Sequence, residues 1–353
     1  MTSASETPIK KTAPRIMMLG IIVIIGVGLW SGAWMYGRTV VANQMDQQLA
    51  QMAENNLQVT YRERTISGYP FRYEVRCENV ELINASGQLI QLGKGRGVAL
   101  VYNPWHVIVE IDGPLTVQNA EDSSTGAWIS GSWELAQTSI RLGNDGLRQL
   151  DVVVSKPAFQ AANLEAPADV RSDELTLHMR KVPETDADLD LYVSTKQLSG
   201  QLLPDTLPLF DTVFQLRIAN GFQLIEGGSV ADLPRLEDGS IPFQLSRVSL
   251  ADGDSSQISV SGEMRLHRNG TLSGDLELEI LGLDQISSLV EQHAPEAASV
   301  PAILKGASDA LGTAETAENG VEIVRLPITL KNGNARIGFL PLGRLPVISI
   351  PGL

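Results

Sequence analysis

The sequence contains very little cysteine and histidine. Cys77 is the only cysteine in 353 residues, which excludes an intramolecular disulfide and any zinc site built from paired cysteines. The four histidines are far apart and form no H-E-x-x-H pattern; they are His106, His178, His267 and His293. We expect Cys77 to be a small buried side chain rather than a reactive thiol.

Catalytic and nucleotide-binding motifs are also missing. There is no G-x-S-x-G elbow, and the glycine-rich stretch 93–97 lacks the P-loop order and leads into a strand-like segment. We interpret that stretch as a tight turn or bulge. Asp186, Asp188 and Asp190 alternate, which predicts a solvated strand face, with a cation site as the alternative. We therefore predict no catalytic, cofactor-binding or metal-binding residues, and an uncharacterised hydrolase is the alternative.

Basic charge is scarce as well. Lysine and arginine number 27 against 41 acidic residues, for a formal net charge of −14. No basic cluster stands out after the N-terminal segment, so nucleic acid is not expected as a partner.

The chain has one hydrophobic run of membrane-spanning length, residues 16–36, and it contains no charged side chain. A helix of this length spans ~30 Å, the hydrocarbon thickness of a bilayer. Lys10, Lys11 and Arg15 precede the run, whereas only Arg38 follows closely, so residues 1–15 are expected in the cytoplasm. We predict a single-pass membrane protein whose ectodomain is exported.

Two alternatives concern this run. Val40 and Ala42 resemble a cleavage pattern before Asn43, so a cleaved signal peptide competes with the retained anchor. Gly28 and Gly32 form a small-xxx-small pair, which is compatible with helix dimerisation or with ordinary glycine use.

After the anchor, residues 37–57 are expected to form a connecting amphipathic helix, because apolar residues recur at helical spacing. Residues 58–353 then predict a mostly β ectodomain built as a long, curved antiparallel meander. Residues 71–78 alternate strictly between apolar and charged, which is typical of a strand with one buried face. Hairpin turns are expected at residues 68–70, 144–146, 269–270 and 332–333, the last two as type I′ turns.

A pair of short helices is expected between Asp284 and Leu311, separated near Pro295, and such a pair is suited to cover one end of a sheet. Residues 163–173, 204–208 and 231–242 are interpreted as surface connections.

Two of the predicted strands carry the candidate ligand-binding residues. In each strand the apolar side chains share one face while charged residues point the other way. If these faces line an open groove, they are suited to lipid; if they form a closed core, they only hold the fold together. The lipid-groove candidates are Phe71, Tyr73, Val75, Leu276, Leu278 and Ile280.

Several motifs together make the sequence similar to a known family. They are the apolar span, GYPFRY at 68–73, YNPWHVI at 102–108, DGP at 112–114, NGTLSG at 269–274 and LPLGRLP at 340–346. In this order they resemble the bacterial domain of unknown function 2125 family. The resemblance implies an alphaproteobacterial envelope protein, and it assigns no functional residues.

The one-faced hairpins also look like those of AsmA-type envelope proteins, whose curved sheets expose an apolar surface to lipid chains. This likeness concerns the fold alone. We therefore expect a single-pass inner-membrane protein whose periplasmic ectodomain binds or shields lipid in a curved sheet. The alternative is a non-enzymatic assembly or scaffold factor that acts through envelope protein partners.

Overall fold

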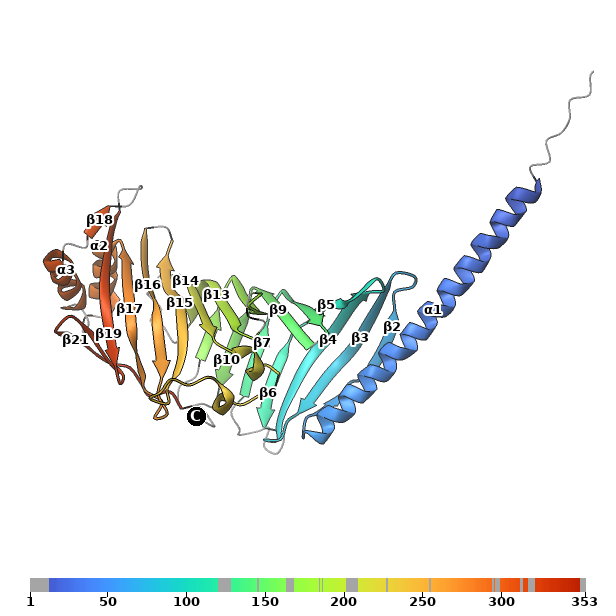
Figure 1. Ribbon diagram of the computed structural model, residues 1–353, viewed down its shortest axis with the longest axis horizontal. Helices are drawn as coiled ribbons and strands as arrows, with labels where there is room; N and C mark the ends of the chain where they lie inside the picture. The colour runs from blue at the N-terminus through green and yellow to red at the C-terminus, as the bar shows by residue number, and fades with distance from the viewer. Residues whose placement is uncertain are drawn as a thin grey trace, which may run out of the picture.

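A computed structural model of the chain describes residues 13–349, apart from residues 120–127, 145, 163–167, 184, 186, 201–208, 227, 254, 294, 296–298, 312–313 and 317–320. Within these residues, a long N-terminal helix leads into an antiparallel sheet of 21 strands, and two short helices precede the last strands. Figure 1 shows the sheet as one long curved layer, with helix α1 at one end and helices α2 and α3 at the other. The predicted mostly β, antiparallel fold is confirmed.

The helices are α1 (Ala13–Glu54), α2 (Leu283–His293) and α3 (Ser299–Leu311), with short 3-10 helices η1 (Gly221–Leu224) and η2 (Val230–Asp232). The strands of the first half are β1 (Gln58–Thr60), β2 (Glu63–Ser67), β3 (Arg72–Ile83), β4 (Gln88–Leu100), β5 (Asn103–Ile111), β6 (Leu115–Asn119), β7 (Trp128–Ser132), β8 (Leu135–Gly143), β9 (Gly146–Ser155), β10 (Ala158–Ala162) and β11 (Ala168–Arg171). Those of the second half are β12 (Glu174–Lys181), β13 (Leu189–Gly200), β14 (Phe210–Ile218), β15 (Ile241–Asp252), β16 (Ser256–Leu266), β17 (Leu272–Leu281), β18 (Ala314–Thr316), β19 (Glu322–Lys331), β20 (Asn334–Ile337) and β21 (Leu340–Arg344).

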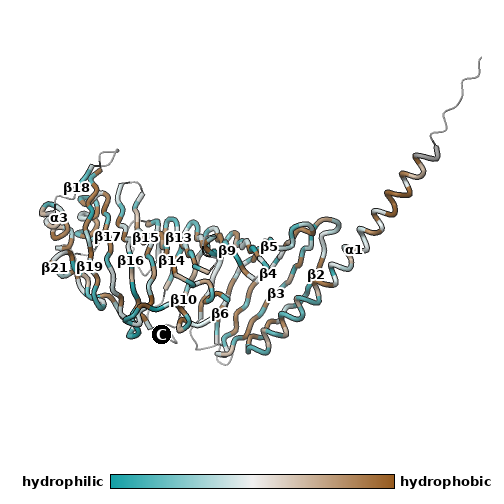
Figure 2. Tube along the Cα trace, in the orientation of Figure 1, coloured by the Kyte–Doolittle hydropathy of each residue, from teal (hydrophilic) through white to brown (hydrophobic). Residues whose placement is uncertain are grey.

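Helix α1 is one continuous helix of 42 residues. From Ile16 onward it is long and apolar enough to cross a membrane, and Figure 2 shows that its hydrophobic half projects away from the sheet. The predicted boundary between anchor and connecting helix at Gly37 is not a break, because one glycine costs a helix interior only about 1 kcal/mol. The helix ends near Asn56, which adopts a left-handed conformation with φ of 58°.

Four successive long strands are interrupted near their middle. The interruptions separate β5 from β6, β7 from β8, β9 from β10 and β11 from β12. Pro114 and Pro157 stand at two of them and lack the N–H group that a β-ladder needs. Two neighbouring interruptions contact each other. Trp133 lies between β7 and β8, and its Nε1 donates to the backbone O of Ile111 at the end of β5, at 2.7 Å. The sheet between β4 and β13 is therefore split into two panels, β5-β8-β9-β12 and β6-β7-β10-β11.

The turn predictions are confirmed in part. Asn332 and Gly333 join β19 to β20 with φ of 50° and 83°, as a type I′ turn requires. Asn269 and Gly270 also lie in a hairpin, but only Gly270 has a positive φ, so the type I′ prediction is wrong there. The glycine-rich stretch 93–97 is no turn or bulge, because it lies in the interior of β4 and pairs with β3.

The C-terminal helices cover one end of the sheet, as predicted. Their residues Leu283, Ile286 and Leu304 pack against strand residues that include Val324 and Leu326, both fully buried. A second cover comes from the connection between β14 and β15, where Phe222 and Leu233 pack against strand residues. The interpretation of residues 231–242 as a plain surface connection is therefore wrong at Leu233, which is 6% exposed.

Candidate functional site

The apolar side chains of the long strands gather on one face of the sheet. Directly paired residues of neighbouring strands point to the same face, so the strand register shows which side chains are neighbours. From Val75 in β3, successive partners lead strand by strand to Leu278 in β17, and from Tyr73 they lead to Leu276. Candidates from two hairpins far apart in the sequence therefore belong to one continuous surface.

We call this surface the apolar face. Its middle row crosses twelve strands and is apolar at every position except one threonine. The row consists of Val75, Gly97, Val109, Thr138, Val152, Leu177, Val193, Phe214, Val248, Val260, Leu278 and Leu326. Flanking rows begin at Tyr73 and at Cys77, and the Cys77 row passes through Ile280.

The cover over the apolar face changes along the sheet. At the C-terminal end, Leu278 is 7% exposed and Ile280 is 1% exposed beneath α2 and α3. In the middle, Phe214 and Val248 are exposed to 38% and 36%, although they are directly paired. The same face is therefore a closed core at one end and open to solvent in the middle.

At the N-terminal end, helix α1 and the apolar face enclose an open cleft of about 700 Å³. This volume lies within the range of ~300–1,000 Å³ that is usual for ligand pockets. Its lining is apolar except for Arg96 and comes from α1, β3, β4, β5 and the β4–β5 turn: Gly37, Val40, Val41, Met45, Tyr73, Val75, Cys77, Gly95, Arg96, Gly97, Val98, Ala99, Val101, Pro104, Val107 and Val109.

Glycines in β4 account for the open floor of the cleft. A Cβ added at Gly95 or at Gly97 would meet no atom within 4 Å, and neither residue has a positive φ. The absent side chains therefore leave empty space above the sheet. Gly37 in α1 differs, because a Cβ there would collide with the hydroxyl of Tyr73. That glycine lets the helix approach the strand.

Aromatic side chains pack helix α1 against the sheet beside the cleft. Trp34 is 8% exposed, stacks on Tyr73 with ring centroids 5.6 Å apart, and meets the edge of Tyr69 at the same distance. Its Nε1 donates to Arg72 O at 3.1 Å. The GYP motif is a turn, as predicted, but its contacts with helix α1 were not predicted.

The six lipid-groove candidates thus lie in three environments. Tyr73 and Val75 line the cleft, whereas Phe71 lies outside it near Trp30, with ring centroids 6.5 Å apart. Leu276, Leu278 and Ile280 share the apolar face but lie at its covered end, where Leu278 and Ile280 are buried. Cys77 also lines the cleft, and burial raises the pKa of its thiol, which keeps it protonated at neutral pH.

The family described as "Uncharacterized protein conserved in bacteria (DUF2125)" matches residues 34–346. The chain belongs to the DUF2125 family. Neither the curated proteins nor the solved structures include a match, so the likeness to AsmA-type proteins stays a prediction.

The opposite face of the DUF2125 sheet is polar and carries a buried carboxylate. Glu74 is 1% exposed and forms ion pairs with Arg72 at 3.0 Å and with Arg76. Arg96 lies 4.0 Å from Glu74 and pairs with Glu110 at 2.8 Å. These three guanidinium groups and two carboxylates lie directly behind the cleft wall.

The polar face also brings together residues that are distant in the sequence of this DUF2125 chain. His106 Nε2 lies 2.9 Å from Ser139 Oγ, and His178 Nδ1 lies 2.8 Å from Asp151 Oδ1. Ser139 and Asp151 are directly paired, so the four side chains form a row across neighbouring strands. Burial opposes ionisation of Asp151, but hydrogen bonds from Gln149 and His178 outweigh it and lower the pKa of the carboxyl. The alternation of residue types within single strands did not predict this row, because the row depends on which strands pair and in which register.

Asp188 and Asp190, two of the three aspartates considered as a cation site, contact other groups of the protein. Asp190 pairs with Arg180 and Arg217, and Asp188 Oδ1 accepts from Asn220 N at 2.9 Å. Asp186 lies outside the described residues. The structure describes no group of three or more histidine, cysteine or acidic side chains suited to a metal ion.

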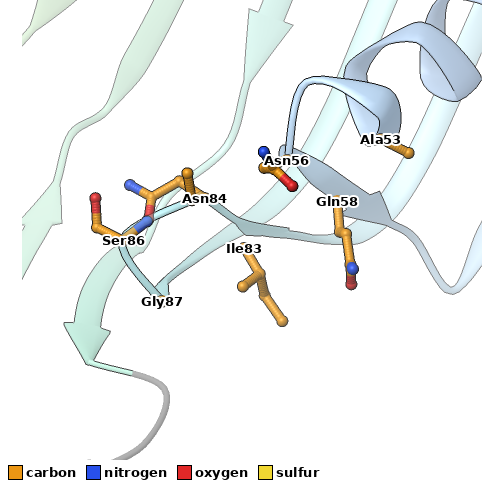
Figure 3. Close-up of a pocket in the computed structure, with 8 residues that line it drawn as sticks. Ala53, Asn56, Gln58, Ile83, Asn84, Ser86 and Gly87 are labelled. Carbon is orange, nitrogen blue, oxygen red and sulfur yellow. The ribbon is translucent and has the colours of Figure 1, made fainter.

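A separate cavity of about 580 Å³ lies between the end of α1 and the β3–β4 turn. Figure 3 shows Asn56 and Gln58 on one side of it and Asn84 and Ser86 on the other. Asn84 Oδ1 already accepts from the backbone N–H groups of Ser86 and Gln88. This cavity is therefore polar and has no titratable lining among the described residues.

Proposed function

We propose that the protein is a membrane-anchored periplasmic envelope protein that binds or shields lipid chains on the apolar face of its curved sheet. The observation that carries this proposal is the apolar cleft between α1 and strands β3 to β5. The cleft continues into a face that is still exposed at Phe214 and Val248. An acyl chain buried there would remove apolar surface from water, at about 25 cal/mol per Å².

The proposed topology rests on charge and on the retained helix. Lys10, Lys11 and Arg15 favour a cytoplasmic N-terminus, which leaves the sheet on the periplasmic side. Cleavage before Asn43 would remove Gly37, Val40 and Val41 from the wall of the cleft. The cleft therefore supports a retained anchor over a cleaved signal peptide.

Filling the cleft tests the proposal. Gly97→Leu places a side chain in open space, so we expect the protein to fold and to lose most of its lipid contacts in the cleft. Full-length protein is reconstituted in vesicles of phosphatidylethanolamine and phosphatidylglycerol, with a trace of phospholipid whose acyl chain ends in a photoreactive group. Mass spectrometry then locates the lipid adducts, which are expected in β3, β4 and β5 of the wild type.

Gly306→Leu in α3 is the matched control, because a Cβ there also meets no atom within 4 Å. Its adduct pattern should equal that of the wild type. Adducts on the apolar half of α1 report ordinary bilayer lipid and should be the same in all three proteins. Wild-type adducts confined to α1, or unchanged β-strand adducts in Gly97→Leu, would contradict lipid binding in the cleft.

The alternative is a scaffold or assembly factor, and the C-terminal end favours it. There the face is filled by the protein's own side chains, and Phe339 is 93% exposed on the last hairpin. A partner protein that buries Phe339 would suit this end. Absence of β-strand lipid adducts in the wild type would favour this alternative.

We also propose that the protein is not an enzyme. The His106 and Ser139 pair lies on the polar face, and neither side chain lines the apolar cleft or the polar cavity beside the β3–β4 turn. We therefore expect His106→Ala and Ser139→Ala to keep both the lipid adducts and any cellular phenotype of the wild type. Complementation of a deletion strain measures the phenotype, and a folded variant that fails to complement would reopen catalysis.

A further inference from the structure

Exposed aromatic residues gather at the tips of two neighbouring hairpins. The β2–β3 tip, residues 68–71, carries Tyr69 and Phe71, which are 50% and 63% exposed. At the other tip, residues 101–105, Tyr102 and Trp105 are 75% and 55% exposed. A hydrogen bond of 2.9 Å from Val101 N to Phe71 O joins the two tips. We call residues 68–71 and 101–105 the aromatic tips.

The first of these tips is held against the apolar half of α1. Trp30 Nε1 donates to Pro70 O at 3.0 Å, and Ser31 Oγ lies 2.9 Å from the hydroxyl of Tyr69. Both helix residues belong to the uncharged run 16–36 that fits the hydrocarbon thickness of a bilayer. The six residue steps from Trp30 to Tyr36 correspond to about 9 Å along the helix axis. The tip thus reaches well below the outer end of the apolar run.

The composition of the tips suits that depth. Neither contains a charged residue. Tyrosine and tryptophan rings combine an apolar body with a polar group and favour the interface between headgroups and acyl chains. A protein partner would have to share this position with the lipids around α1, so the bilayer is the occupant that the contacts favour.

We propose that the aromatic tips insert into the interfacial layer of the same membrane that α1 crosses. The sheet is then held to phospholipid at two places, by the helix and by the tips. Val101 and Pro104 belong to a tip and also line the cleft, so insertion brings one end of the cleft to the level of the phospholipid headgroups. Insertion itself does not depend on lipid occupying the cleft.

A fluorescent label on the second tip tests the insertion. Cys77→Ser removes the single natural cysteine, and Asn103→Cys then places a bimane label on the tip without removing an aromatic ring. The full-length protein is reconstituted in phosphatidylcholine vesicles whose acyl chains carry bromine, a short-range quencher. We expect several-fold stronger quenching at residue 103 than at a label on Ser86→Cys. Ser86 lies in the turn at the far end of β4, a strand of 13 residues or about 40 Å.

Further variants decide the role of the rings. Tyr102→Asp together with Trp105→Asp should reduce quenching of the Asn103→Cys label severalfold, whereas Gly97→Leu should leave it unchanged. A label on Tyr102→Cys provides a second position should Asn103→Cys fail to fold. Quenching at the tip no stronger than at Ser86→Cys would overturn the proposal. Quenching that survives the two aspartates would also overturn it, because α1 alone would then hold the tip in the bilayer.

Discussion

Leu278→Asp is expected to unfold the C-terminal end of the sheet. Leu278 is 7% exposed and packs among Ile280, Leu283 and Leu326 beneath the two C-terminal helices. An aspartate there finds no cationic partner in that cluster, and burying an unpaired carboxylate costs several kcal/mol. Domains of ordinary stability have only about 5–15 kcal/mol in total. Thermal unfolding of the full-length protein, followed by circular dichroism, should show a strongly lowered first transition.

Leu250→Asp is the matched control for that experiment. Leu250 lies on the same apolar face, in the row that contains Ile280, but it is 40% exposed. Water can still reach a carboxylate at this position, so we expect a much smaller loss of stability. Equal losses in Leu278→Asp and Leu250→Asp would show that α2 and α3 do not close this end of the face.

The alternation of apolar and polar residues predicted which side chains share a face, but not what covers them. Val75 and Leu278 have the same local pattern, and the register places them in one row. Only tertiary packing distinguishes them, because α2 and α3 cover Leu278 whereas α1 leaves a cleft beside Val75. The apolar face is therefore an open cleft beside α1 and a closed core beneath α2 and α3.

Glycine was the residue type whose structural role the sequence predicted least well. The stretch 93–97 suggested a turn because glycine usually interrupts regular structure, yet it runs through β4 and provides the floor of the cleft. Gly37 marked a boundary in the predicted organisation, but in the structure a side chain there would collide with the hydroxyl of Tyr73. At Gly37 the missing side chain leaves room for the hydroxyl of Tyr73, whereas at Gly95 and Gly97 it leaves empty space. One chain without its tertiary contacts cannot reveal such a role.

The contacts that position the cleft are also long-range. Trp34 and Tyr73 are 39 residues apart in the sequence, and their contact joins helix α1 to the first long strand. Amphipathic spacing predicted a helix after the anchor, but no local pattern specifies which strand that helix meets. The turn at the GYP motif could therefore be predicted from its residue types. Its contacts with Trp30 and Trp34 could not, because they depend on how α1 packs against the sheet.

Glu74→Ala is expected to destabilise the strand that forms the cleft wall. Glu74 is 1% exposed and lies among Arg72, Arg76 and Arg96, so its removal leaves three guanidinium groups close together without their shared carboxylate. The side chains of Arg72, Arg76 and Arg96 are 54%, 57% and 44% exposed, so water still solvates them once the carboxylate is gone. We therefore expect a loss between the about 0–1 kcal/mol of an exposed ion pair and the about 3–5 kcal/mol of a fully buried one. Thermal unfolding of the full-length variant measures this loss.

Glu78→Ala provides the comparison within the same strand. The Glu78 side chain is 41% exposed and its carboxylate lies 3.5 Å from Lys94, and exposed pairs of this kind contribute about 0–1 kcal/mol. We expect Glu78→Ala to unfold close to the wild type. If Glu74→Ala does the same, the arginine cluster is held by other contacts. Because Glu74 lies between Tyr73 and Val75 in β3 and points to the other face, its loss should also weaken lipid adducts in the cleft, whereas Glu78→Ala should leave them intact.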